Sequence, residues 1–324
     1  MANQIITITD GQASAAVPGP LHDGDTATFK TAAPAPTPAY DVLFTGPLTS
    51  SALTAFVKAH QGKVIGLPGG TMTAPLSLTG LTVTLIQTAD IHSTVDASPG
   101  VVFLRGCQLT WDLGGHKLTA PIARSQIVGK ADGAEQHHGI RQDGGRVTIQ
   151  NGTISGVWGD CVTARAWATA NGGDGKPPTS ILRNLTLTTA GRCGWSWIQA
   201  AGGTSATNVS TNDTGAWGVD IETNVGSDQV GSVVISGGRI GAHGIGNNPD
   251  WATDDIIAAI QLAGGKSSSP IGPITLAWIS ADQFDIVAAH VGDLTLTNLV
   301  STAKARLILE NVGAVHRSGL VNIT

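Results

Sequence analysis

The feature that most constrains the fold is a short pattern of alternating β-branched and polar residues that returns along the chain, each time followed by glycine turns. Alternation with a period of two indicates a β-strand with one buried face. The pattern returns at irregular intervals of about 20 to 35 residues, which favours the coils of a solenoid over a strict leucine-rich or hexapeptide repeat. The segments are VVFLRGCQLTWDLGG (101–115), RVTIQNGTISGVWGD (146–160), TSILRNLTLTTAGRCG (179–194), GSVVISGGRIGAHG (231–244), GPITLAWIS (272–280), GDLTLTNLV (292–300) and RLILENVG (306–313).

We therefore predict an all-β fold, a right-handed parallel β-helix in which alternate side chains of each strand point into the core. A β-sandwich built from hairpins is the alternative. It is disfavoured because the N-G, G-G and D-G turns join strands in threes rather than in pairs. Several coils can be aligned on a glycine that follows a bulky residue. The aligned pairs are Trp158-Gly159, Cys193-Gly194, Trp217-Gly218 and His243-Gly244.

The composition agrees with a glycine-rich β fold that other chains partly cover. Glycine contributes 43 residues and charged residues only 13% of the chain, well below the roughly 25% of ordinary soluble domains. A net charge of −5 without a Lys/Arg cluster in the sequence argues against nucleic acid as a partner. No apolar run is long enough for a membrane span, and the start, MANQIITITDG, lacks the basic and apolar regions of a signal peptide.

No metal and no cofactor are predicted. The three cysteines, Cys107, Cys161 and Cys193, fit no C-x-x-C spacing and are expected to be buried thiols of a protein made in a reducing compartment. The aspartates do not have the spacing of a calcium-binding loop. The pair His137-His138 lies in a Gly/Asp-rich segment, which favours an exposed loop over a metal site.

The chain divides into two predicted parts. Residues 1–39 contain the alternating segments IITITDG and TATFK and a stiff Pro/Ala-rich linker, and we expect them to form a small N-terminal adaptor segment. Alternatively, they form a first strand pair packed on the rest of the chain. Residues 40–324 are expected to form the β-helix, with a capping helix near residues 50–61 whose N-cap is Ser50 or Ser51.

Two motifs resemble a known family. A short amphipathic helix that runs into GKVIGLPGGTMT (62–73), and the coil WDLGGHKLT (111–119), look like the pectate-lyase-like β-helix proteins of bacteriophage tails, the tail spikes and minor tail proteins. The resemblance implies a virion protein of the tail, made in the host cytoplasm. Since the low charge also predicts covered surface, and LVNIT (320–324) ends within a predicted strand, we expect a homotrimer or a larger assembly with other tail-protein subunits. The motifs specify fold rather than chemistry.

Three carboxylates are candidate catalytic residues. The alignment places Asp160, Asp220 and Glu222 near one outward sheet, with Asp160 and Asp220 two coils or about 10 Å apart, near the upper limit for the carboxylate pair of an inverting glycosidase. Outward carboxylates are more often solvated surface. No complete signature of a polygalacturonase, alginate epimerase or pectate lyase is present.

The tryptophans point to a candidate carbohydrate-binding site. The chain contains eight tryptophans but a single tyrosine, which is an unusual ratio. Most of the tryptophans lie in or beside predicted strands, where they would fill the core. Trp167 and Trp251 instead lie in two long insertions that are expected to leave the rod at the same edge. Together with Asp250 and Asn171 they are candidates for gripping a sugar, because an indole stacks on its C–H face while polar groups bond its hydroxyls. Contact with a neighbouring subunit is the alternative.

Two functions follow from these observations. The first is a structural and host-recognition protein of a phage tail that contacts host-surface glycan. The second is a polysaccharide depolymerase, a glycoside hydrolase or lyase on a β-helix scaffold. A passive adhesin is a third possibility. The absence of a complete catalytic signature favours the first.

Overall fold

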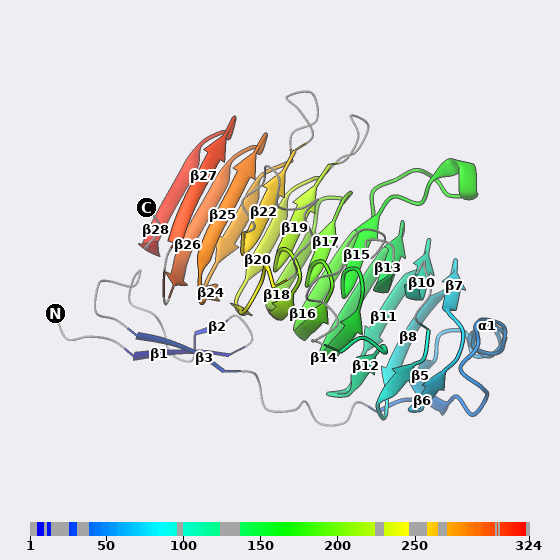
Figure 1. Ribbon diagram of the computed structural model, residues 1–324. Coiled ribbons are helices and arrows are strands. Elements are labelled where there is room, and N and C mark those ends of the chain that lie inside the picture. The colour runs from blue at the N-terminus through cyan, green and yellow to red at the C-terminus, as the bar shows by residue number, and fades with distance from the viewer. Residues whose placement is uncertain are drawn as a thin grey trace.

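The computed structural model describes residues 5–9, 12–13, 26–30, 39–95, 100–123, 137–223, 230–245, 258–264, 271–301, 303 and 305–321. Residues 40–321 of this set wind into a right-handed parallel β-helix (Figure 1), which confirms the predicted fold. Except for one antiparallel pair near the N-terminus, every strand pairing in the described residues is parallel, so the β-sandwich alternative is wrong.

Nine strands form one face of the rod. Each strand pairs in parallel with the strand of the coil before and of the coil after it. In the order of the chain they are β7 (Leu76–Thr79), β10 (Gly100–Arg105), β13 (His138–Asp143), β15 (Val162–Arg165), β17 (Trp195–Trp197), β19 (Val219–Glu222), β22 (Ile260–Ala263), β25 (Phe284–Ala289) and β27 (Ala305–Glu310).

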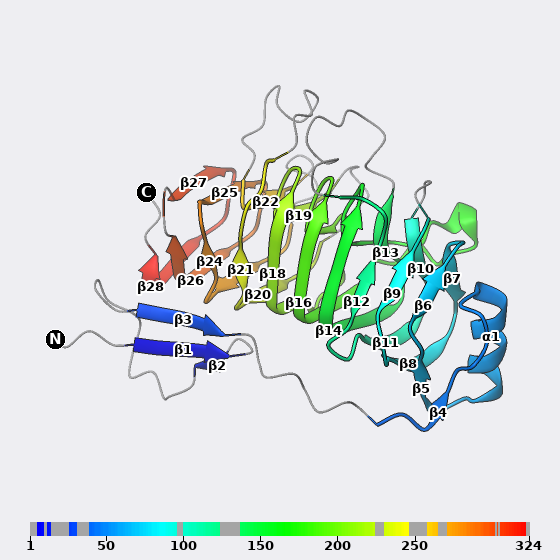
Figure 2. The same cartoon turned by 60° about the horizontal axis from the view of Figure 1, so that its bottom comes forward.

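Sixteen further strands form a second, bent sheet that supplies the other two faces. The longest of them lie side by side in the middle of the rod (Figure 2). They are β4 (Val42–Leu43), β5 (Val64–Leu67), β6 (Gly70–Met72), β8 (Thr82–Gln87), β9 (Ile91–Ser93), β11 (Gln108–Asp112), β12 (Lys117–Thr119), β14 (Arg146–Val157), β16 (Thr179–Ala190), β18 (Thr204–Thr214), β20 (Val233–Ser236), β21 (Arg239–Ile240), β23 (Ile274–Ala277), β24 (Ser280–Ala281), β26 (Leu294–Ser301) and β28 (Val315–Val321).

In three central coils the bend between these two faces contains one left-handed asparagine. Asn151, Asn184 and Asn208 occupy this position in β14, β16 and β18 with φ of 59°, 50° and 52°. Asparagine tolerates this conformation better than other non-glycine residues. Their side chains form a ladder, since Nδ2 of Asn184 donates to Oδ1 of Asn151 (3.0 Å) and Nδ2 of Asn208 donates to Oδ1 of Asn184 (3.2 Å). The ladder therefore fixes the coil-to-coil register at the bend.

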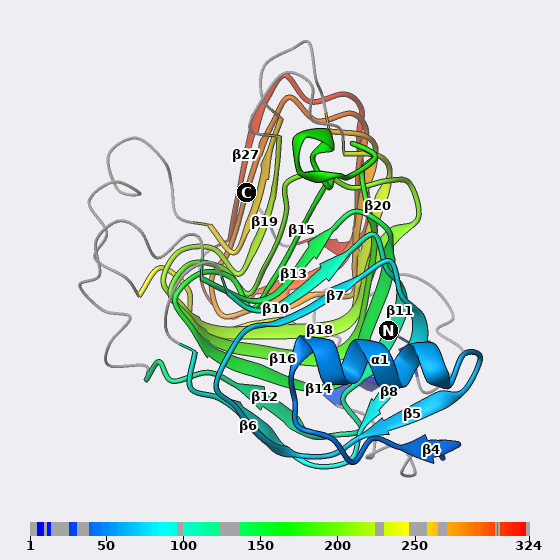
Figure 3. The ribbon, with the colours of Figure 1, turned by 90° about the vertical axis from the view of Figure 1, so that its right-hand side faces the viewer.

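A helix covers the first end of the rod. Helix α1 (Ser50–Ala59) lies across the first coil (Figure 3) and buries Leu53 and Val57 against it. Its N-cap is Thr49, whose hydroxyl accepts the N–H of Ala52, so the prediction of Ser50 or Ser51 is off by one residue or more. The Ser50 hydroxyl instead joins the helix to the first coil, because it accepts the N–H of Ser77 at 2.8 Å.

The core is mainly apolar, as the alternation predicts, although Gln142 is fully buried in register with the core residues Leu104 and Ala164. Trp111, Trp195, Trp197 and Trp217 are buried, whereas Trp158 and Trp278 are only half-buried. The cysteines are free and buried, as predicted, and burial raises the pKa of each of these thiols.

The remaining described elements are small. Strands β1 (Ile5–Thr9), β2 (Gln12–Ala13) and β3 (Thr26–Lys30) form a separate sheet, and η2 (Thr169–Asn171) is a single turn of 3₁₀-helix. Among the described residues there is no helix long and apolar enough to cross a membrane.

The first prediction concerns the ladder. Asn184→Gly keeps the left-handed backbone but removes both ladder hydrogen bonds, so we expect the free energy of unfolding to fall by about 1 to 3 kcal/mol. Asn311→Gly is the matched control, because Asn311 also has a positive φ (50°) but makes no ladder bond within the described chain. Denaturant unfolding followed by circular dichroism measures both. An equal effect of the two substitutions would contradict the ladder's role.

Candidate functional site

Polar side chains gather on the outward face of the nine-stranded sheet. In the centre of the sheet, Thr163 of β15, Ser196 of β17 and Asp220 of β19 are aligned on neighbouring strands. Near the strand ends, Arg105 of β10 is aligned with Asp143 of β13, and Asp143 with Arg165 of β15. Neighbouring coils are about 4.8 Å apart, so side chains distant in the sequence come into contact here.

The three predicted catalytic carboxylates lie around one arginine. Arg192, in the turn before β17, places Nη1 3.4 Å from Oδ2 of Asp160 and Nη2 2.6 Å from Oδ2 of Asp220. The same Nη2 lies 3.0 Å from Oε1 of Glu222. Arg192 is 8% exposed, and Asp160 and Asp220 are not exposed at all. The structure thus brings the predicted carboxylates together, but in a buried ion cluster whose central cation the sequence analysis missed.

Asp160 and Asp220 have different surroundings within this cluster. Oδ2 of Asp160 accepts the hydroxyl of Ser196 (2.6 Å), and its Oδ1 accepts the backbone N–H of Cys193 (3.1 Å). Asp220 Oδ1 has no hydrogen-bond partner among the described residues. Burial, followed by the nearby charge of Glu222, raises the pKa of Asp220 well above its usual range, although Arg192 opposes the shift. Asp220 therefore holds a proton more readily than an ordinary aspartate.

The arrangement does not suit the inverting glycosidase mechanism. Such an enzyme needs space for a water molecule between its two carboxyl groups. Here the guanidinium of Arg192 contacts both Asp160 and Asp220 and fills that space. The cluster satisfies buried charges, and its burial keeps a polymer from reaching them.

His138 completes the cluster. It begins β13, and its Nδ1 accepts the N–H of Asp160 at 3.2 Å and lies 3.4 Å from Oδ2 of the same residue. Burial lowers the pKa of His138 to about 4, although the charge of Asp160 opposes this. His137 and His138 are 2% and 5% exposed, so the expectation of an exposed loop is wrong. The sheet buries them because β13 starts at His138, one coil below Asp160.

A cleft opens at the ends of β10, β13 and β15, where Arg105, Asp143 and Arg165 lie. Its volume is about 820 Å³, and Trp167 and Asn171, two of the predicted sugar-binding residues, line it. The other lining groups include the side chains of Arg105, Arg141 and Arg165. The cleft thus combines an indole, an amide and three cations.

One carboxylate pairs with all three of these arginines. The Nε of Arg141 lies 2.9 Å from Oδ1 of Asp143, and the Nε of Arg165 lies 3.2 Å from the same oxygen. The Nε of Arg105 lies 3.5 Å from Oδ2. No Lys/Arg cluster is visible along the sequence, because Arg105, Arg141 and Arg165 come from three coils and meet only through the strand register.

The loop that carries Trp167 is held by its own hydrogen bonds. It follows β15 and stands out from the rod as the green curl in Figure 1. The Trp167 carbonyl accepts the N–H of Gly175 (2.9 Å), and the Gln199 side chain accepts the N–H of Ala166 (2.7 Å). The indole lies over Gly106, where an added Cβ would come within 3.0 Å of the ring. The ring is therefore positioned by backbone that only glycine provides at this point.

The other predicted sugar-binding residues are not part of this cleft as described. Trp251 and Asp250 lie outside the described residues. The second insertion, residues 247–265, is described only over 258–264, so the expectation that the two insertions leave the rod at one edge lies outside the described residues. The glycine alignment behind this expectation is wrong at this coil, since Gly218 is in register with Ala259 rather than with Gly244.

The glycine alignment also fails at one further point. Cys193-Gly194 and Trp217-Gly218 are in register as predicted, but Gly159 is in register with Arg192, two residues away from the expected partner. Coils differ in the length of the turn before the strand, so a glycine there does not fix the register.

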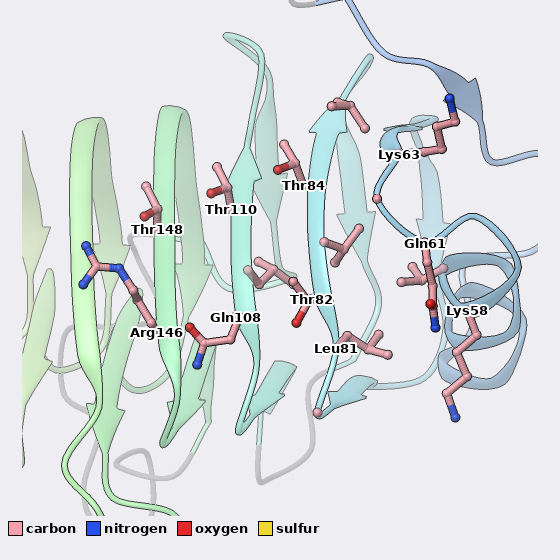
Figure 4. A pocket seen from close by; sticks show the side chains of 16 residues that line it. Lys58, Gln61, Lys63, Leu81, Thr82, Thr84, Gln108, Thr110, Arg146 and Thr148 are labelled. Carbon is pink, nitrogen blue, oxygen red and sulfur yellow. The ribbon is translucent and has the colours of Figure 1, made fainter.

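A second hollow, of about 710 Å³, lies beside helix α1 at the first end of the rod (Figure 4). It is lined by a row of threonines, Thr84, Thr110 and Thr148, and by the cationic side chains of Lys58 and Arg146, among others. Its lining contains no aromatic ring and no carboxylate. The cleft beside Trp167 therefore offers the richer chemistry. In the described part of the chain no three His, Cys, Asp or Glu side chains are grouped so as to hold a metal ion.

Comparisons with known proteins find similarity at the level of the backbone. No protein-family model matches the chain. No curated protein sequence matches it either. Among solved structures, the tailspike protein gp49 of the Acinetobacter baumannii bacteriophage Fri1, a capsular polysaccharide depolymerase, is 13% identical with a TM-score of 0.47 over 86% of this chain. The chain spans 55% of the length of that tailspike protein.

Two further structures are similar to this chain. The catalytic domain of a GH87 alpha-1,3-glucanase is 15% identical with a TM-score of 0.45, over 93% of this chain and 70% of that one. An alginate lyase from Paenibacillus is 13% identical with a TM-score of 0.39, over 87% of this chain and 99% of that one.

The second prediction compares the two aspartates. Asp160→Asn should lower the free energy of unfolding at pH 7 by about 2 to 4 kcal/mol, because it removes a buried charge that Arg192 needs. Asp220→Asn should lower it less, since burial raises the pKa of Asp220 and already disfavours its charged form.

The pH dependence separates them further. Because the pKa of Asp220 is raised on folding, its contribution to stability is present below about pH 4 and is lost as the pH rises towards the folded pKa. This loss should disappear in Asp220→Asn. Denaturant titrations between pH 4 and 8 test both variants, and equal destabilisation by the two would contradict the assignment.

The third prediction concerns His138, whose pKa is lowered on folding. Its contribution to stability is therefore present above about pH 6.5 and is lost as the pH falls towards 4, by up to about 3 kcal/mol. His138→Asn keeps an acceptor for the N–H of Asp160 but does not titrate, so its stability should change less over this range. Replacement of the exposed His316 by Asn is the control. The idea is refuted if the wild type and His138→Asn respond to acid in parallel.

Proposed function

We propose that this chain is a structural and host-recognition protein of a bacteriophage tail and that its cleft beside Trp167 binds host-surface polysaccharide. The observation that carries the proposal is the cleft itself. It places a half-buried indole next to amide and guanidinium donors on the outward face of a rigid sheet. An aromatic ring with polar groups around it is suited to a sugar, whose C–H face stacks on the ring while its hydroxyls accept and donate hydrogen bonds.

The shape of the site supports a long ligand. Strand alignment continues from β7 to β27 along the outward face, so the polar surface follows the axis of the rod rather than a single point. A polymer lying along that axis would meet one new set of side chains at each coil. The motifs at residues 62–73 and 111–119 and the low proportion of charged residues support a place in a tail, as a homotrimer or with other tail subunits.

The depolymerase alternative draws on Asp220, a buried carboxyl with a raised pKa beside two other carboxylates. Its burial and its contact with Arg192 argue against turnover. We therefore infer recognition without cleavage.

The fourth prediction tests the cleft. Trp167→Ala removes the stacking surface, so affinity for the bound glycan should fall about fivefold or more, which corresponds to about 1 kcal/mol. Lys176→Ala is the control, because Lys176 lies in the same loop but does not line the cleft. Binding is measured on an array of bacterial capsular and cell-wall polysaccharides, with circular dichroism as a check of the fold.

The same samples are assayed for reducing ends and for unsaturated products, and we expect neither. An unchanged affinity in Trp167→Ala would exclude this cleft as the binding site. Product release that is abolished by Asp220→Asn, with binding intact, would instead establish the depolymerase.

A further inference from the structure

The cleft beside Trp167 carries more positive charge than its own carboxylate balances. Its lining holds Arg105, Arg141 and Arg165 against Asp143 alone. One guanidinium suffices to pair a buried carboxylate, so two positive charges are left in a chain whose formal net charge is −5. Asp174, in the nearby loop, forms no ion pair with these arginines in the described part of the chain, and its Oδ1 accepts the N–H of Lys176.

The geometry leaves the outer ends of these arginines available. All three approach Asp143 with Nε, the inner nitrogen of the guanidinium. Nη1 of Arg105 donates to the hydroxyl of Ser77 at 3.3 Å, but no described residue accepts from the Nη groups of Arg141 or Arg165. The side chains of Arg105 and Arg165 are 36% and 39% exposed, so water and a ligand can reach them.

A purely structural role explains only part of this arrangement. Asp143 is 4% exposed and needs a cation, and Arg141, which is nearly buried, supplies one at 2.9 Å. Arg105 and Arg165 are half-exposed and flank the same carboxylate from the two neighbouring strands. Asp143 offsets one of the three positive charges, and a second anion at the exposed guanidinium ends would offset another.

We propose that the ligand of this cleft is an acidic polysaccharide. Its anionic group, a sugar carboxylate or a phosphate, binds the Nη groups of Arg165 and Arg105, and the sugar ring stacks on Trp167. Guanidinium groups bind both kinds of anion through paired hydrogen bonds. The inference rests on the proposed glycan recognition and specifies its substrate class.

The test uses defined polymers. Polygalacturonate and hyaluronan carry carboxylates, and a capsular polysaccharide with phosphodiester links carries phosphates. Carboxyl-reduced polygalacturonate, carboxyl-reduced hyaluronan and dextran are the neutral probes. We expect at least one acidic polymer to bind and the neutral probes not to bind. Binding of the acidic polymer should weaken as the salt concentration rises from 50 to 300 mM, roughly the range over which the electrostatic screening length falls below 10 Å. The polymer that binds shows whether a carboxylate or a phosphate is recognised.

Three variants locate the charge. Arg165→Gln should lower affinity for the acidic polymer about tenfold and reduce its salt dependence, and Arg165→Lys should restore part of both. Arg183→Gln is the matched control, because Arg183 is an exposed arginine of β16 on the other sheet and should leave affinity unchanged. Unfolding curves of each variant separate a loss of binding from a loss of fold.

The outcomes distinguish the two levels of the proposal. Equal binding of an acidic polymer and its carboxyl-reduced form, or equal affinity of Arg165→Gln and Arg183→Gln, overturns the acidic class while glycan recognition stands. Binding of dextran alone does the same. Failure of every polymer here and on the polysaccharide array overturns glycan recognition itself, and the inference with it.

Discussion

The structure depends on parallel, in-register hydrogen bonding between one coil and the next. Each strand of the nine-stranded sheet pairs only with its neighbours in the stack, and the register is kept from β7 to β27. The core forms because this register superimposes apolar side chains, and the outward face forms because it superimposes polar ones. The asparagine ladder at the bend adds side-chain hydrogen bonds to the same alignment. A shift of one residue in any coil would exchange the two faces.

The same constraint explains why charge gathers in two places. Asp143 collects arginines from the coils before and after it, and Arg192 collects carboxylates from the coils on either side of its own turn. Burying one of these charged groups alone costs free energy, and an oppositely charged partner offsets much of that cost. The two clusters nevertheless differ in accessibility, because the carboxylate cluster is closed and the arginine cluster faces a cleft. This difference is the reason that we propose recognition at the arginine cluster and a structural role for the carboxylate cluster.

Much of the fold is predictable from the sequence, because alternating apolar and polar residues indicate strands and glycines indicate the turns between them. The capping helix is also predictable, but its cap is Thr49 because Ser50 is used to join the helix to β7. The carboxylates could be assigned to one sheet, yet their partner Arg192 lies in a turn without a pattern. The arginine cluster and the burial of His138 depend on the register between coils of unequal length. A short stretch of sequence does not contain that information.

The direction of the backbone hydrogen bonds has a mechanical consequence. They run along the rod, so a pull along its axis loads the coils in series, and the pair with the fewest bonds opens first. Strands β14 and β16 are in register over ten residue pairs, whereas β21 and β24 share two and β18 and β21 share one. On its narrow third face the rod is thus weakest around Arg239 and Ile240, well away from the cleft beside Trp167. Across the same coil boundary, β18–β20 and β19–β22 are each in register over four residue pairs, so the third face would open before the other two.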